Sequence, residues 1–329
     1  MPGRVAATIG LTTVATAVAI VLTEVLVRTF FPAFDPSGRV DFTHAVGERL
    51  MLGEPGTVLR QRKNTGDFDV TVRFNRHGLR DDKDVAEAAP DDIVVVGDSV
   101  AWGWGIEEGQ RFSDVLATLT GRRVFNLAAP TDIAGYRDLL DLARGLGARI
   151  ESVVLALSME TDLKDYDAPE RPIGQDDTRW EWRAWLERHS AAYLMLATVA
   201  HQTPPLKAVA VALGVITPNL EGIPRQAYSD AMVVSSARRV AALARRQSLF
   251  VVLIPSRALW VGERRDVEDR IHRAFLAALA REGIDAIDLR PLLEAGGAPL
   301  SYHFAQDGHW NSRGHRLAAE AIARRLMAP

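Results

Sequence analysis

The chain contains no cysteine among its 329 residues, which excludes both disulfide bonds and metal sites built on thiolates. This absence leaves the redox compartment undecided. An excess of basic charge is also missing, because the formal net charge is −3, and we therefore expect no nucleic-acid surface. The sequence has no internal repeat. With 47% hydrophobic residues, a chain of this length can bury a full core, so we expect one large domain with appendages.

Charge is also missing from the N-terminal segment. No charged residue occurs from Val5 to Leu22, and Glu24 is the first one after that run. A helix over residues 5–27 rises about 35 Å, enough to cross a hydrocarbon core of about 30 Å. We predict that residues 1–30 form an uncleaved membrane anchor. The alternatives are a cleaved signal peptide, whose small-residue cleavage sites would lie inside the apolar run, and a buried helix of a soluble protein.

An anchor of this kind has consequences for location. We expect the membrane to be a partner through residues 5–27 and the soluble domain to lie on its far side, in the periplasm or another extracytoplasmic space. Arg4 and Arg28 flank the apolar run on opposite sides, so basic charge gives little guidance on orientation.

An alternating pattern of strands and helices begins near residue 91. Apolar runs typical of strands in a parallel sheet cover residues 93–96, 123–127, 152–157, 249–254 and 286–289. Helical segments follow at 111–119, 135–146, 267–281 and 312–326. This pattern predicts an α/β fold over residues 91–329, a doubly wound parallel sheet flanked by helices and preceded by one transmembrane helix. We interpret residues 31–90 as a linker and accessory strand region, with a half-buried strand within 65–75.

A long insertion at about 164–228 separates the third and fourth predicted strands. Its tryptophans, Trp180, Trp182 and Trp185, are typical either of a lid beside the site or of a helix packed on the sheet. We favour the packed helix. The apolar stretch 208–216 is too short to span a membrane, but it could touch a membrane or a protein partner.

Two short motifs supply the groups that acyl-transfer chemistry uses. Gly97-Asp98-Ser99 directly follows the first apolar run, and Asp307-Gly308-His309 precedes the last helical segment. A serine hydroxyl becomes nucleophilic when a neutral imidazole takes its proton and a carboxylate orients that imidazole. Asp307 and His309 are two residues apart, so on an extended segment their side chains leave the same face. The sequence predicts Ser99 as nucleophile, His309 as general base and then acid, and Asp307 as the group that orients it.

The two motifs resemble the first and last blocks of the SGNH, or GDSL-type, hydrolase superfamily. The resemblance covers roughly residues 90–162 and 249–326. The Asp-x-His-Trp form of the last block is similar to that of membrane-associated members related to alginate O-acetylation proteins. The resemblance implies acyl esters as substrates, often acetyl groups on envelope carbohydrate, and neither a metal nor an organic cofactor.

The middle blocks of the superfamily, which supply oxyanion donors, differ in this chain. Thr131 stands where the second block has a glycine, and Thr161 stands where the third block has an asparagine. The resemblance implies that the backbone amides of Ser99 and Thr131 bind the oxyanion, together with the Thr161 hydroxyl. Removal of one oxyanion donor typically lowers turnover by about 10²–10³-fold, so these departures predict a slower enzyme or an inactive one.

Residues next to these motifs are candidates for substrate contact. Trp102 and Trp104 follow the nucleophile and could either line an acyl pocket or pack against the next helix. Asp162 and Trp310 adjoin the third and last blocks, and we include Trp102, Asp162 and Trp310 as substrate-binding candidates. His315, near the start of the last helix, is predicted to be structural.

Two hypotheses of different classes follow from the sequence. The first is a membrane-tethered serine esterase or O-acyltransferase acting on acyl or carbohydrate esters. The second is a catalytically weak or inactive SGNH-like module, which serves as a binding or scaffold subunit of a membrane complex with a protein partner. A hydrogen bond between the Ser99 hydroxyl and a His309 nitrogen, with Asp307 on the other nitrogen, would favour the enzyme.

Overall fold

The computed structural model describes residues 2–36, 40, 42–47, 50–63, 65–168, 181–213 and 228–328. The chain divides into two compact units. Unit 1 comprises residues 1–39, 63–66 and 171–217, and unit 2 comprises residues 40–62, 67–170 and 218–329. All residues to which the sequence analysis assigns chemistry lie in unit 2.

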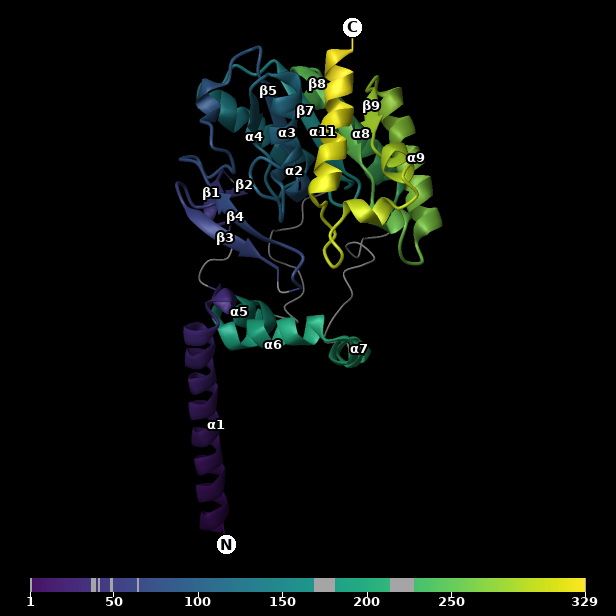
Figure 1. Cartoon of the computed structure of the whole chain (residues 1–329). Helices are drawn as coiled ribbons and strands as arrows, with labels where there is room; N and C mark the ends of the chain where they lie inside the picture. The colour runs from purple at the N-terminus through teal and green to yellow at the C-terminus, as the bar shows by residue number, and fades with distance from the viewer. Residues whose placement is uncertain are drawn as a thin grey trace. The chain divides into compact units, whose positions relative to one another are not determined.

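Unit 2 is built on a parallel sheet of five strands in the order β6–β5–β7–β8–β9 (Figure 1). The strands are β5 (Ile93–Gly97), β6 (Val124–Asn126), β7 (Ser152–Ser158), β8 (Ser248–Ile254) and β9 (Ala286–Asp288). Every residue of β5 is buried, as expected of a strand covered on both faces. The predicted doubly wound α/β fold is confirmed, and each predicted strand lies within one residue of its observed bounds.

Helices cover both faces of this sheet. Alternate residues of β5 belong to two different clusters of buried side chains, Val94 and Val96 to one and Ile93 and Val95 to the other. The first cluster contains α4 (Ile133–Gly145), α8 (Asp230–Ala244) and α9 (Arg265–Arg281). The second contains α2 (Ser99–Trp102), α3 (Phe112–Thr120), α10 (Arg290–Glu294) and α11 (Ser312–Met327). The core of unit 2 is therefore a three-layer sandwich with the sheet in the middle.

Two antiparallel pairs of short strands precede the sheet in the chain. The first pair is β1 (His44–Val46) with β2 (Leu50–Leu52), and the second is β3 (Val58–Arg62) with β4 (Asp69–Arg73). Burial alternates along β4, so the predicted half-buried strand is confirmed. Short 3₁₀ turns complete unit 2: η3 (Val85–Glu87), η5 (Arg257–Leu259) and η6 (Pro299–Tyr302).

Unit 1 consists of helices. α1 (Pro2–Phe30) is followed by the turn η1 (Pro32–Phe34), and α5 (Glu181–His189), α6 (Ala191–Gln202) and α7 (Pro204–Ala212) come from the predicted insertion. The 23 residues of α1 from Thr8 to Phe30 are long and apolar enough to cross a membrane. A buried core helix of a soluble protein is disfavoured, because none of that segment's most apolar window is buried.

The prediction that the insertion's tryptophans pack on the sheet is wrong for two of them. Trp182 and Trp185 on α5 expose 56% and 59% of their surfaces, and they belong to unit 1 rather than to the sheet's core. Trp180 and residues 214–216 of the apolar stretch lie outside the described residues. α5 packs against α6 of unit 1, and local periodicity does not encode which element a helix packs against.

Candidate active site

The turn after β5 presents Ser99 at the carboxyl end of the sheet. A Cβ atom at Gly97 would lie 2.6 Å from the Ala101 Cβ and 2.9 Å from the Ala156 carbonyl oxygen, so only glycine fits where β5 meets α2. Asp98 caps α2 by accepting a hydrogen bond of 2.8 Å from the Val100 amide. Ser99 is therefore the first residue of α2, where the helix dipole favours negative charge.

The second motif brings an imidazole to this serine. The Ser99 Oγ and the His309 Nε2 are 2.8 Å apart. The His309 Nδ1 is hydrogen-bonded to the Asp307 Oδ1, which also accepts the His309 backbone amide at 3.0 Å. A carboxylate on Nδ1 assigns the ring proton to that atom, so Nε2 is free to accept the proton of the serine hydroxyl. Asp307 is buried, whereas the His309 side chain remains 25% exposed at the surface that a substrate would approach.

An aromatic ring covers one side of His309. Trp104 stacks on the imidazole with a centroid distance of 5.6 Å and an interplanar angle of 23°. Trp104 is partly exposed, and its inner edge contacts the buried Trp102 ring. Stacking restricts rotation of the imidazole and leaves its hydrogen-bonding edge directed at Ser99. Of the two tryptophans after the nucleophile, Trp104 therefore lies beside the reacting groups.

A buried arginine holds the loop that carries Trp104. Arg80 donates to the Trp102 carbonyl at 3.3 Å and to the carbonyls of Gly103 and Ile106, and its guanidinium lies 4.5 Å from the Trp102 ring centroid. Burial and the nearby charge of Arg111 lower the pKa of Arg80 to about 9. The sequence analysis missed Arg80, because no motif or spacing connects it to Ser99.

A second buried arginine supports the histidine segment. Arg257, just after β8, donates from its side chain to the Asp307 carbonyl oxygen at 2.6 Å, and its own backbone amide donates to the Glu160 carboxylate at 2.8 Å. Burial lowers the pKa of Arg257, and the charges of Glu160 and Asp307 oppose that shift. Arg257 thus ties the ends of β7 and β8 to the segment that carries His309. Sequence reasoning missed it for the same reason as Arg80.

Two backbone amides at this end of the sheet are free to bind an anion. The segment after β6 runs beside the segment after β5, since the amides of Leu127 and Ala129 donate to the Val95 and Gly97 carbonyls at 2.9 and 3.1 Å. Thr131 comes two residues later. Across the part of the chain that the structure describes, no hydrogen bond is made by the amides of Ser99 or Thr131. Both are therefore available as oxyanion donors, as the resemblance implies.

The two threonines at the altered blocks have different surroundings. The Thr131 side chain lies against Gly135, where an added Cβ would come within 1.9 Å of its hydroxyl. The hydroxyl of Thr161 donates to the Asp98 carboxylate at 2.8 Å. Because a hydroxyl has one proton, Thr161 offers no donor to an oxyanion in this arrangement. Its bond instead links the nucleophile turn to the end of β7.

The three substrate-binding candidates from the sequence are all buried. Trp102, Asp162 and Trp310 expose 1%, 0% and 1% of their surfaces, so they pack beneath the site and do not line it. Asp162 accepts hydrogen bonds of 2.7 Å from the Tyr136 hydroxyl and the Ser158 amide. Burial and the charge of Asp98 raise the pKa of Asp162 well above its usual range.

Two further histidines are structural, as predicted for His315. The His315 Nδ1 accepts the Phe112 amide at 3.1 Å, and burial with the charges of Arg80 and Arg111 lowers its pKa to about 3. Burial lowers the pKa of His303 to about 4. Among the described residues, no group of three or more histidine, aspartate or glutamate side chains is arranged to hold a metal ion.

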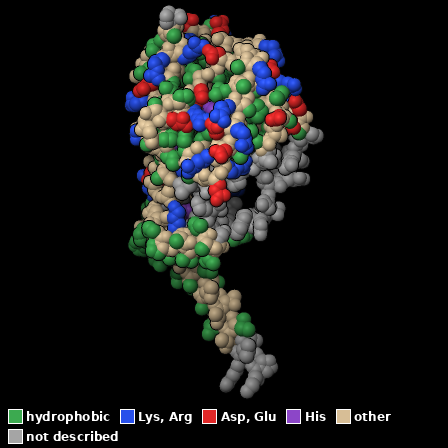
Figure 2. All heavy atoms as spheres, turned by 90° about the vertical axis from the view of Figure 1, so that its right-hand side faces the viewer, with side chains coloured by type: hydrophobic (Ala, Val, Ile, Leu, Met, Phe, Trp, Pro, Cys, Tyr) green, Lys and Arg blue, Asp and Glu red, His purple; other side chains and the backbone are tan. Residues whose placement is uncertain are grey.

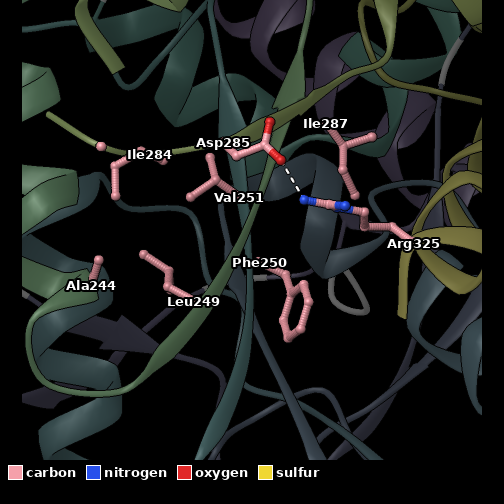
Figure 3. A pocket seen from close by; sticks show the side chains of 9 residues that line it. Ala244, Leu249, Phe250, Val251, Ile284, Asp285, Ile287 and Arg325 are labelled. Atoms are coloured by element: carbon pink, nitrogen blue, oxygen red, sulfur yellow. Dashed lines mark hydrogen bonds and ion pairs between the residues drawn. The ribbon is translucent and has the colours of Figure 1, made fainter. Parts of the chain in front are cut away.

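A hollow at the other end of the strands is distinct from this site. It has a volume of about 280 Å³ and is lined by residues such as Leu249, Ile284 and Ile287, with the ion pair Asp285–Arg325 at its edge (Figure 3). Leu249 is near the start of β8, whereas Ser99 and Arg257 follow the carboxyl ends of their strands. In doubly wound sheets ligands bind outside the carboxyl ends, which favours the Ser99 site.

Comparison with known proteins identifies a related domain. Residues 221–329 match the family described as the SGNH hydrolase-like domain of the acetyltransferase AlgX. This range includes Arg257, Asp307 and His309 but not Ser99. The resemblance to the SGNH superfamily, with similarity to the AlgX-type domain, is confirmed, and it supports an esterase or acyltransferase in general. A search of the curated proteins finds no match.

Solved structures of hydrolases are also similar at low identity. A lipase/acylhydrolase from Enterococcus faecalis is 12% identical, with a TM-score of 0.40 over 71% of this chain and 95% of that one. A G-D-S-L lipolytic protein from Veillonella parvula is 14% identical, with a TM-score of 0.39 over 70% and 95%. A mutant acetyl-xylooligosaccharide esterase from Geobacillus is 10% identical, with a TM-score of 0.41 over 74% and 96%. Likenesses this distant carry no argument about the activity of this chain.

Proposed function

We propose that this protein is a membrane-tethered serine esterase or O-acyltransferase. The observation that carries the proposal is the hydrogen-bonded chain from the Ser99 hydroxyl through His309 to Asp307, with 2.8 Å between Oγ and Nε2. A serine, an imidazole and a carboxylate connected in this order make an activated nucleophile. The match of residues 221–329 to an acetyltransferase domain supports the same class of reaction.

The proposed reaction has two stages. The Ser99 Oγ attacks the carbonyl carbon of an acyl ester while the His309 Nε2 takes the serine proton. The amides of Ser99 and Thr131 then hold the oxyanion of the tetrahedral intermediate. His309 gives its proton to the departing alcohol oxygen as the ester C–O bond breaks, which leaves an acyl-serine. In the second stage His309 deprotonates water or a sugar hydroxyl, whose oxygen attacks the acyl carbon. The bond between that carbon and the Ser99 Oγ then breaks, and His309 returns its proton to Oγ. Hydrolysis and transfer differ only in that acceptor.

The substrate proposal follows from the resemblance. We favour an acetyl ester, with a carbohydrate of the cell envelope as the acyl donor or acceptor, because AlgX-type domains are described as acetyltransferases. His309 is partly exposed, which suits an acceptor that arrives from solvent.

The membrane proposal rests on α1. We propose that residues 1–30 anchor the chain, residues 31–90 connect it, and residues 91–329 carry the catalytic domain, with an insertion at about 164–228, on the extracytoplasmic side. The length and apolarity of Thr8–Phe30 support an anchor. Protease added to intact spheroplasts should then degrade the catalytic domain, and protection of that domain would reverse the orientation.

Active-site titration tests the catalytic proposal. A fluorophosphonate probe should label the detergent-solubilised protein stoichiometrically, and the substitutions Ser99→Ala and His309→Ala should each abolish labelling. Ser248→Ala is a matched control, because Ser248 is exposed at the start of β8, at the opposite end of the strands from Ser99, and its loss should leave labelling intact. Absence of labelling in the unaltered protein, under conditions that label a known serine esterase, would favour the alternative of a non-catalytic binding or scaffold module.

A further inference from the structure

Helix α7 in unit 1 exposes its apolar side chains. Leu206 and Val209 on α7 and the following Leu213 expose 49%, 57% and 72% of their surfaces. Lys207 is the only charged residue of the helix, and it is half-buried. A surface helix of a soluble protein has the opposite arrangement, with apolar residues inward and charges outward. The orientation of α7 therefore suits an apolar environment outside the protein.

The preceding helix also exposes apolar side chains. On α6, Ala191, Leu194 and Thr198 are buried, whereas Leu196 and Val199 are exposed. We call Leu196, Val199, Leu206, Val209 and Leu213 the α6–α7 apolar stripe. Figure 2 shows hydrophobic side chains gathered over the helices from which α1 extends. From Ala191 to Leu213 the sequence holds one charged residue, so little on these helices opposes contact with lipid.

Polar contacts fix α6 to the C-terminal part of α1. The Glu24 carboxylate accepts hydrogen bonds from the Ser190 hydroxyl and from the amides of Ala191 and Ala192, at 2.8, 2.8 and 3.0 Å. Arg28 donates to Glu24 at 2.7 Å and to the His189 carbonyl at 2.8 Å. These bonds satisfy the first amides of α6, so its start is held beside Glu24.

The position of Glu24 relates the stripe to the apolar run of α1. The uncharged residues from Val5 to Thr23 form a helix about 28 Å long, close to the thickness of a hydrocarbon core. Residues 5–27 rise about 35 Å, more than the core of about 30 Å, so Glu24, the first charged residue after the uncharged run, is expected near the boundary with the lipid headgroups. Because α6 begins beside Glu24, α6 and α7 start at the same boundary. About five turns of helix thus set the depth of the stripe.

Exposed aromatic side chains occur in the same unit near this level. Phe30 and Phe31, at the end of α1, expose 69% and 52% of their surfaces, and Trp182 and Trp185 on α5 are also exposed. Tryptophan is enriched where membrane meets water, because its ring is apolar and its N–H can still reach a polar partner. α5, with its tryptophans and the exposed Arg188, combines the residue types found at that interface.

We propose that α6 and α7 lie in the headgroup–acyl boundary of the membrane, with the α6–α7 apolar stripe in contact with the acyl chains. This proposal rests on the proposed anchoring of α1. α7 has 9 residues and cannot span a bilayer, so the stripe binds the surface as an interfacial helix does. The protein would thereby be held by a second, in-plane element in addition to the spanning helix.

The absence of cysteine permits a direct test. Single cysteines introduced by Leu206→Cys and Val209→Cys carry an environment-sensitive fluorophore on the stripe. Arg324→Cys places the same label on the exposed side of α11, and Ala17→Cys places it within α1. The full chain is reconstituted into vesicles of phosphatidylethanolamine and phosphatidylglycerol, and each label is quenched in turn by aqueous iodide and by lipids brominated on their acyl chains.

Lipid contact predicts opposite responses at the stripe and at the control. Labels at positions 206 and 209 should be quenched by brominated lipid, and iodide should quench them at least about threefold less than the label at position 324. Free access of iodide to the stripe, with the label at position 17 in lipid, would overturn the proposal and leave the anchor intact. Access of iodide to position 17 would instead show that the anchor itself is wrong. Shielding of the stripe from both quenchers would assign it to a protein partner and overturn lipid contact.

Discussion

Helices α7 and α11 expose side chains of different kinds to their surroundings. On α11, Ala318, Ala319 and Ile322 are buried, and Arg316 and Arg324 are exposed. On α7 Leu206 and Val209 are exposed, whereas Lys207 and Val211 are half-buried. Unit 2 thus exposes charged side chains around an apolar core, whereas α7 of unit 1 exposes apolar side chains, as the proposed membrane contact would require. Substitutions should therefore affect catalysis and folding in unit 2 and membrane contact in unit 1.

The largest effect should come from the carboxylate of the proposed triad. Asp307→Asn removes the charge that holds the Nδ1 proton of His309 and stabilises the imidazolium, so turnover of a soluble acetyl ester should fall about 10³–10⁴-fold. The α6–α7 stripe should keep its lipid contact, because it belongs to the other unit. Turnover within tenfold of the unaltered protein would contradict the proposed role of Asp307.

The next largest effect should come from Arg80, a buried hydrogen-bond donor of unit 2. Arg80→Met leaves the buried carbonyls of Trp102, Gly103 and Ile106 without their donor, and the free energy of unfolding should fall by about 3 kcal/mol. Denaturant titration of the protein in detergent measures this change. Arg316→Met, on the exposed side of α11, is the control and should change stability by less than about 0.5 kcal/mol.

A third test uses the buried histidine of α11. The pKa of His315 is about 3 in the folded protein, below the ordinary value of 6.5, so the unfolded chain binds the proton first as pH falls. The free energy of unfolding therefore holds its full value, as far as His315 is concerned, above pH 6.5. Between pH 6.5 and 3 it falls by up to about 1.4 kcal/mol per pH unit. His315→Asn keeps an acceptor for the Phe112 amide but does not titrate. Denaturant titrations at several pH values should therefore give a shallower loss for the variant, and parallel curves would refute this account.

The smallest effect is expected on α7 itself. Leu206→Ser and Val209→Ser remove apolar groups that are already exposed, so the unfolding free energy of unit 2 should change by less than about 0.5 kcal/mol. Leu139→Ser, at a fully buried position of α4, should cost at least about 3 kcal/mol. Near-ultraviolet circular dichroism during denaturation compares the two. Similar losses of unfolding free energy for the substitutions on α7 and on α4 would contradict the proposed difference between the two units.

The sheet was predictable from the sequence because its strands are buried on both faces. Continuous apolar runs such as 93–96 and 249–254 leave strong signals, and each matches β5 or β8 within one residue. The proximity of Ser99, His309 and Asp307 was also expected from their motifs, because the two motifs resemble the blocks that form one site in the SGNH superfamily. Their catalytic roles remain a prediction.

The supporting residues could not be predicted from the sequence. Arg80 and Arg257 act through hydrogen bonds from their side chains to backbone carbonyls, and such contacts leave no periodicity or spacing in a sequence. The burial of Trp102 and Trp310 was missed because adjacency to a motif does not tell which way a ring points. The exposure of Trp182 and Trp185 depends on the packing of α5 within unit 1, which is long-range information of the same kind.

The Asp307–His309 pair is held together locally, which affects where it can occur in the chain order of a related protein. Asp307 binds both the ring and the backbone amide of His309, so the carboxylate–imidazole pair is complete within a single tripeptide. Within the triad, the bond to Ser99 is the one that crosses the fold, over 210 residues of sequence. The carboxylate–imidazole pair is therefore independent of its place in the chain order. A circularly permuted chain that places this tripeptide before the serine would keep the same chemistry, provided the loop still reaches the end of β5.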